Sequence, residues 1–160
     1  MDTSSGILRC SAWTLAAALA MQVAVEKDAV ASPMPPVPFT ISQLSELNFG
    51  EAPQGDWAKE VFPGTAPASS LGTFLVTGPR GQCYTLLLPT SPLALETHDS
   101  GTGPGRIEMS GFRSIPQAGP HGQLDPSGRQ LITVGARRGP LAPNQRRGRY
   151  SGTYFISIIF

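Results

Sequence analysis

Hydrophobic and polar residues alternate with a period of two in several short segments, most clearly at the C-terminus. One set of alternating positions in that segment comprises Tyr150, Gly152, Tyr154, Ile156, Ile158 and Phe160. A period of two in a segment rich in aromatic and β-branched residues predicts a strand with one apolar face. Because an apolar strand at an open sheet edge recruits other chains, we expect this strand to lie in the centre of its sheet.

Six earlier segments also have the composition of short strands: residues 39–50, 58–62, 71–78, 82–89, 106–112 and 129–138. In the last of these, Leu131, Thr133 and Gly135 share one face and Ile132, Val134 and Ala136 share the other. The first segment offers five core candidates, which are Phe39, Ile41, Leu44, Leu47 and Phe49. The tight-turn composition GPRG joins residues 71–78 to 82–89 and predicts a β-hairpin.

Seven or eight short strands with turn signals between them predict an all-β fold, a two-layer antiparallel β-sandwich of the immunoglobulin-like kind. The composition agrees, because 18 glycines and 16 prolines in 160 residues favour short segments over long helices. With 40% hydrophobic and 14% charged residues, the chain is typical of a globular domain. Two connections, residues 90–105 and 113–128, are long and are candidates for binding loops.

The N-terminal segment differs in character from the rest. Arg9 precedes an uncharged, Ala/Leu-rich run over residues 10–25, and Ala29 and Ala31 have the spacing that signal peptidase recognises. We interpret residues 1–31 as a helical signal peptide, with cleavage near Ala20 or a retained anchoring helix as the alternatives. Residues 32–38 form a proline-rich leader and residues 39–160 a single sandwich domain. The protein is therefore expected to be exported, to the periplasm, cell surface or medium, with no membrane span after signal removal.

Five arginines fall within thirteen residues around a turn: Arg137, Arg138, Arg146, Arg147 and Arg149. A hairpin there brings them into one positive patch, which suits an anionic cell-surface polymer. The alternative is a set of solubilising charges that protect strand edges. Nucleic acid is not an expected partner, because export separates the protein from it and no stacking aromatic residues interleave the arginines. The formal net charge of +1 identifies no partner by itself.

The sequence shows no catalytic motif. His98 stands beside two acidic residues and His121 stands alone, but neither spacing specifies a metal site or a general base. We therefore expect no enzymatic activity, no cofactor and no metal ligands. Two glycines are interpreted as structural: Gly50 as a strand end with positive φ, and Gly152 as space for an aromatic ring of the other sheet or as a bend.

Four motifs occur in order along the chain: LNFG, QCYTLLLP, LDPSGRQLITVGA and NQRRGRYSGTYFISIIF. Together they resemble the bacterial Domain of Unknown Function 4402 family, over residues 39–160. The resemblance implies an exported, single-domain, pilin-like β-sandwich from a Gram-negative bacterium, and no activity is established for the family. The proline-rich leader departs from a strand-donating pilin, because proline lacks the N–H that pairing requires.

These expectations lead to a function class. We expect a non-enzymatic structural, adhesive or surface-assembly protein, with like subunits or an anionic cell-surface polymer as partners. The alternative is a monomeric periplasmic or secreted module that binds a carbohydrate or a metal through its two long loops.

Overall fold

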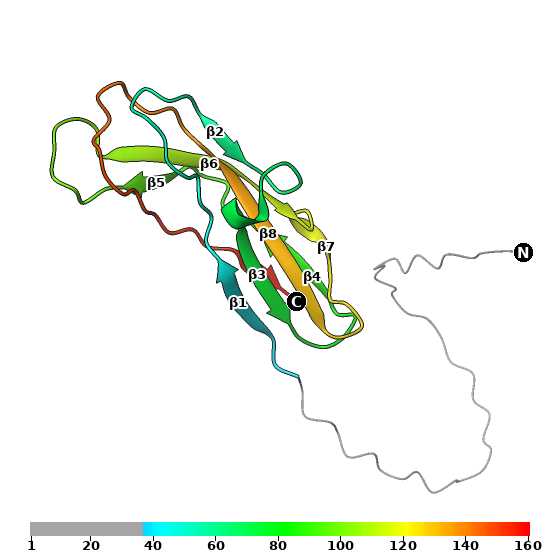
Figure 1. Ribbon diagram of the computed structural model, residues 1–160. Coiled ribbons are helices and arrows are strands. Elements are labelled where there is room, and N and C mark those ends of the chain that lie inside the picture. The colour runs from blue at the N-terminus through cyan, green and yellow to red at the C-terminus, as the bar shows by residue number, and fades with distance from the viewer. Residues whose placement is uncertain (1–36) are drawn as a thin grey trace, which may run out of the picture. The chain divides into compact units, whose positions relative to one another are not determined.

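The computed structural model describes residues 37–160, which contain antiparallel strands and one short 3-10 helix, Ala68–Ser70 (Figure 1). The sandwich domain expected over residues 39–160 falls within this part. The expected signal-peptide helix and most of the proline-rich leader lie outside the described residues. Residues 37–160 contain no helix with the length and hydrophobicity that crossing a membrane requires.

The strands form two antiparallel sheets, which confirms the predicted all-β sandwich (Figure 1). The larger sheet has the order β1-β3-β8-β6-β5, and β2 pairs with the C-terminal part of β8. Its strands are β1 (Thr40–Ser45), β2 (Lys59–Val61), β3 (Gly72–Thr77), β5 (Leu93–Glu96), β6 (Arg106–Ile115) and β8 (Arg129–Arg138). The smaller sheet has the order β7-β4-β9, with β4 (Cys83–Leu87), β7 (Gly119–Gln123) and β9 (Ser157–Ile159).

The core lies where the smaller sheet covers β3 and β8. Its buried members are Phe74, Val76, Ile132 and Val134 from the larger sheet, Tyr84 and Leu86 from β4, and Leu124. The predicted division of β8 into two faces is confirmed, because Ile132, Val134 and Ala136 are all fully buried whereas Leu131 is exposed. Burying each large aliphatic side chain stabilises the fold by roughly 1.5–3 kcal/mol, so this cluster holds the two sheets together.

The predicted β-hairpin over residues 71–89 is wrong. β3 pairs with β1 and β8 in the larger sheet, whereas β4 pairs with β7 and β9 in the smaller one. The turn therefore carries the chain from one sheet to the other, and the Gly78 N–H donates to the Gly128 carbonyl at 2.9 Å. Alternation identified the buried face of each strand, but it does not say which sheet a strand joins.

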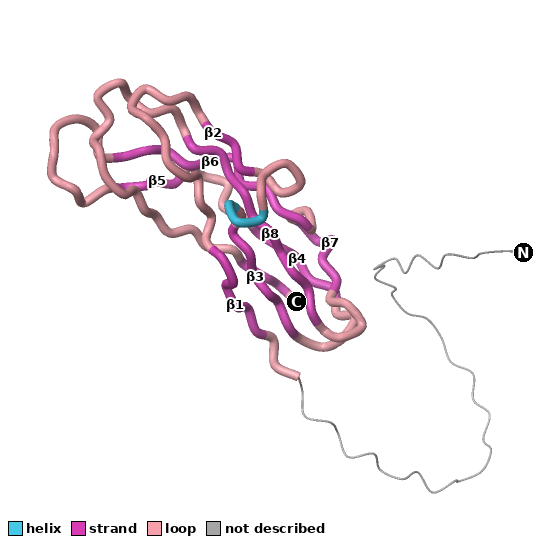
Figure 2. The backbone as a smooth tube through the Cα atoms, in the orientation of Figure 1, coloured by secondary structure: helices cyan, strands magenta, loops and turns pink. Residues whose placement is uncertain are grey.

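The C-terminal strand was expected in the centre of a sheet, and this is also wrong. Within residues 37–160, β9 pairs only with β4 and forms an edge of the smaller sheet. The alternation itself is confirmed, since Tyr154, Ile156 and Ile158 pack against the core while Phe155 is 78% exposed and Ile159 55% exposed. Residues 152–156 follow an unpaired course past the larger sheet before β9 begins (Figure 2).

Two other expectations also need correction. The long connections are shorter than expected, because residues 90–105 contain β5 and residues 113–128 contain the end of β6 and all of β7. Three core candidates near the start, Phe39, Ile41 and Leu44, are exposed instead. Phe39 precedes β1, and Ile41 and Leu44 belong to it. Among the strands of residues 37–160, β1 is an edge strand of the larger sheet.

Candidate binding groove

A large groove opens where the smaller sheet does not cover the larger one. The three strands β7, β4 and β9 face β3 and β8, and two loop segments approach the rest of the larger sheet (Figure 2). Gln43 and residues 45–54 and 145–154 line the groove together with side chains of β5, β6 and β8. Its volume is about 1600 Å³. This exceeds the about 300–1,000 Å³ of ordinary small-molecule pockets.

The floor of the groove is apolar. Ile107 and Met109 alternate along β6 on its inward face and are 7% and 2% exposed. Leu95 lies opposite Ile107 in the register of β5 and β6 and also lines the groove. The sequence indicated β6 as a strand but did not indicate that this part of its inward face lacks a covering strand.

Gln145 lines the groove, is 4% exposed, and links several of the surrounding loops by hydrogen bonds. Its side-chain nitrogen donates to the Pro104 carbonyl at 2.7 Å and lies 2.9 Å from the Tyr150 hydroxyl. Its side-chain oxygen accepts from the Ala142 N–H at 3.2 Å. The Gln54 side chain donates to the Gln145 carbonyl, which joins the two loop walls. Sequence analysis missed Gln145, because an isolated glutamine in a proline-rich loop gives no signal.

The five predicted arginines do not form one patch. Arg137 and Arg138 are adjacent in β8 and therefore point to opposite faces of the sheet. Arg137 is half-exposed, with its Nε 4.0 Å from Glu60. Arg146 is held against a neighbouring loop by bonds to the Asp99 and Gly103 carbonyls. Only the other two predicted arginines, Arg147 and Arg149, are both exposed and at the groove.

Arg138 is a buried ion-pair residue rather than a surface charge. Its side chain is 5% exposed, and its Nη2 donates to Asp56 Oδ2 at 2.7 Å and to the Trp57 carbonyl at 2.6 Å. The hydrogen bond from Arg138 is the main reason that the pKa of Asp56 lies below its ordinary value. The pair attaches the loop before β2 to the end of β8. Sequence analysis did not single out Asp56, because the two residues are far apart in the chain.

The residues predicted to be structural have the following roles. Gly50 has the expected positive φ, 70°, but it lies in the loop after β1, which ends at Ser45, and not at the end of a strand. Gly152 lies so close to β5 that a Cβ would collide with the Ala94 carbonyl, so the close neighbour is backbone and not an aromatic ring. The Tyr150 hydroxyl donates to the Arg146 carbonyl at 2.7 Å and stabilises the groove wall. Phe160 stacks on Phe39, and its ring also lies 6.1 Å from that of Tyr84.

Tyr154 lies at the end of the groove nearer β9. Burial raises the pKa of Tyr154 to about 12, with a smaller contribution from the negative charge of Glu46. Its hydroxyl is buried and has no hydrogen-bond partner within residues 37–160. The hydroxyl lies directly over Gly72, where a Cβ would collide with it. A glycine at the start of β3 therefore makes room for this ring.

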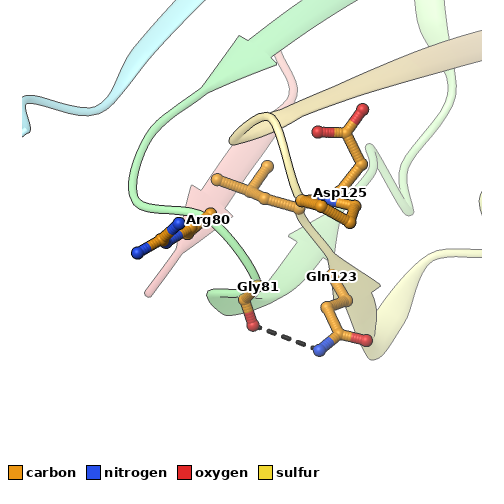
Figure 3. Close-up of a pocket in the computed structure, with 6 residues that line it drawn as sticks. Arg80, Gly81, Gln123 and Asp125 are labelled. Carbon is orange, nitrogen blue, oxygen red and sulfur yellow. Dashed lines mark hydrogen bonds between the residues drawn. The ribbon is translucent and has the colours of Figure 1, made fainter.

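A second, smaller pocket of about 410 Å³ lies between two turns, the one that joins β3 to β4 and the one that joins β7 to β8 (Figure 3). The Gln123 side chain donates to the Gly81 carbonyl there at 3.1 Å. Asp125 accepts from the Ser127 hydroxyl at 2.6 Å and from the Ser127 and Arg129 N–H groups, and these bonds lower the pKa of Asp125. Because the carboxylate is already satisfied within its own turn, this pocket is a structural feature.

Residues 37–160 contain no group of three or more His, Cys, Asp or Glu side chains arranged to hold a metal ion. His98 and His121 are both exposed, in a loop and in β7 respectively. No family model, curated protein or solved structure matches the chain.

Proposed function

We propose that this chain is an exported, non-enzymatic protein of a Gram-negative bacterium that acts in adhesion or surface assembly by binding another chain or polymer. The observation that carries the proposal is the unequal pair of sheets. A six-stranded sheet faces a three-stranded one and leaves an apolar-floored groove of about 1600 Å³ between two loop walls. The size of this groove supports a partner larger than an ordinary small-molecule ligand.

Two further observations support this proposal. The expected signal peptide over residues 1–31 accounts for export, and the motif resemblance to the Domain of Unknown Function 4402 family agrees with it. Apolar side chains also remain exposed along sheet edges, including Phe39 and Ile41 at β1 and Ile159 in β9. Exposed apolar residues at sheet edges are typical sites of association with other chains.

The alternative, a carbohydrate- or metal-binding module that uses the two long loops, has less support. The strands within those loops, β5 and β7, lie at edges of different sheets. What remains of each loop is therefore shorter than a binding loop of the expected length.

Cell fractionation of the source bacterium tests the proposal. Antibodies raised against residues 37–160 are used to follow the chain, and mass spectrometry determines its N-terminus. We expect a shortened chain in the periplasm, on the surface or in the medium. A full-length chain in the cytosol would overturn the proposal. Sedimentation velocity over a range of concentrations then separates binding to like subunits from binding to another partner.

A further inference from the structure

Most strand edges within residues 37–160 are protected against the addition of another strand. β2 and β9 are only three residues long, and β2 also carries Lys59 and Glu60. β7 contains Pro120, and two backbone hydrogen bonds between Glu96 and Ser151 cover the end of β5. Short length, charge, proline and covering segments are the usual means by which proteins prevent pairing at an edge.

β1 has none of these protections. Its six residues, TISQLS, include no charge, proline or glycine, and the first five are exposed. Within residues 37–160 only β3 pairs with it, so its outer N–H and C=O groups are unpaired. Pro38, which lacks an N–H, precedes this edge, and the register with β3 shifts between Gln43 and Ser45. The regular part of the edge is therefore residues 39–43.

The apolar side chains of this stretch extend the core to the open side of the sandwich. Ile41 lies opposite the buried Val76 of β3 and therefore shares its inward face, but it is 45% exposed because no strand flanks it. Phe39 is on the same face and stacks on Phe160, and both rings remain partly exposed. A strand added here buries these side chains well if it presents an apolar residue opposite Ile41.

A second copy of β1 meets this requirement. Two identical strands pair antiparallel about a two-fold axis, and the midpoint of residues 39–43 is Ile41. With the axis there, Ile41 lies opposite Ile41 of the second copy, and Phe39 lies opposite its Gln43. All these side chains are on the inward face, where directly opposed residues make contact. Since residues 39–43 carry no charge, the two copies do not repel each other along this edge.

We propose that β1 joins two copies of this chain edge to edge and antiparallel, with the two-fold axis at Ile41, so that the two larger sheets become one. This inference rests on the surface-assembly part of the proposed function and names a like subunit as the partner. Because both copies use the same edge, assembly closes at a dimer and does not continue into a fibre. The contact is only about 17 Å long, so we expect a weak, reversible dimer.

Sedimentation velocity over a range of about 5–500 µM protein tests for the dimer. The sample is the chain with the N-terminus that is found in the bacterium. We expect a reversible shift from monomer to dimer as the concentration rises. A monomer over the whole range would overturn the proposal, and so would polymers that keep growing with concentration.

Charge variants at the axis test the register. Ile41→Lys and Ile41→Glu each place like charges opposite each other, so each variant alone should dimerise at least about tenfold more weakly. Mixing the two variants in equal amounts at low salt places Lys opposite Glu and should restore the dimer. Restoration also shows that both variants fold. If the mixture remains monomeric while both variants still unfold cooperatively, the two-fold axis is not at Ile41 and the proposal is wrong.

Ile159→Lys is the matched control. Ile159 is also an exposed isoleucine in an edge strand, but it belongs to β9 in the smaller sheet. The same substitution there should leave the Kd of the dimer unchanged. A loss as large as that of Ile41→Lys would contradict the assignment to β1.

Amide hydrogen exchange in dilute and concentrated samples locates the contact. We expect new protection in residues 39–43 of the concentrated sample and none in β9. A dimer that is protected elsewhere would overturn the assignment to β1, while like subunits would remain as the partner in the proposed function. A strict monomer would overturn the inference alone, because cell fractionation tests the proposed function separately.

Discussion

The C-terminal strand offers the sharpest test of how this fold is stabilised. Ile158 and Ile159 are adjacent in β9 and have the same side chain, but Ile158 packs against the core while Ile159 is 55% exposed. Ile158 also lies opposite the buried Leu86 of β4 in the strand register. Replacing each isoleucine with alanine therefore compares two faces of one strand at constant chemistry.

The expected magnitudes differ clearly. Replacing a buried isoleucine with alanine costs about 2–5 kcal/mol, and Ile158 belongs at the low end because it is only partly buried, so we expect about 2 kcal/mol. For Ile159→Ala we expect about 0.5 kcal/mol or less, as at other surface positions. In a domain of this size, the Ile158 variant should lower Tm by about 6–10 °C.

Urea denaturation of the two variants and the unchanged chain, followed by circular dichroism, measures the effect. The midpoint of Ile158→Ala should fall by about 1 M, while the slope of each transition stays constant. Ile158→Val is a graded control that should cost about 1 kcal/mol. Equal losses at Ile158 and Ile159, or a larger loss at Ile159, would refute the alternation on which the position of β9 depends.

Three further predictions concern other parts of the domain. Gly72→Ala should destabilise the chain by about 1–3 kcal/mol, because its Cβ meets the Tyr154 hydroxyl, and Tyr154→Phe should recover much of this loss in a double-mutant cycle of urea midpoints. The lowered pKa of Asp56 contributes stability above its ordinary value of 3.8, which is lost as pH falls through the folded value. Asp56→Asn, which leaves the buried Arg138 without a carboxylate, should therefore be less stable at pH 7 and show a flatter loss of stability below about pH 4. Ile132→Ala should cost about 2–5 kcal/mol by urea denaturation, since Ile132 is fully buried.

Local periodicity predicted those features that depend on one strand alone. The inward face of β8 at Ile132 and Val134, and that of the C-terminal segment at Tyr154 and Ile158, followed from alternation, because a buried strand face requires apolar side chains at every second position. These positions define the core, which is why the fold class was predicted correctly.

Sheet membership was not predictable in the same way. β3 and β4 follow each other closely and are both apolar, so the sequence favoured a hairpin, but each strand pairs with distant segments instead. The edge position of β9 has the same origin, because an apolar face indicates burial against the other sheet and does not indicate how many neighbours flank the strand. Pairing depends on contacts between remote residues, and a single sequence does not record them.

The groove was not predictable from the sequence for a further reason. Its walls are loops whose hydrophobic residues follow no regular spacing, and Gln145 and Asp56 contribute through contacts with remote segments.

The same loops explain how an incomplete sheet remains stable. They keep Ile107 and Met109 almost fully buried although no strand within residues 37–160 covers them, so the empty groove exposes little apolar surface. A wall residue that water reaches loses little by having no backbone partner, because water satisfies its N–H and C=O groups. A partner in the groove therefore gains little from backbone hydrogen bonds or from the buried floor. Its affinity must come mainly from contacts with side chains that remain exposed in part, such as Leu95, Arg147 and Arg149.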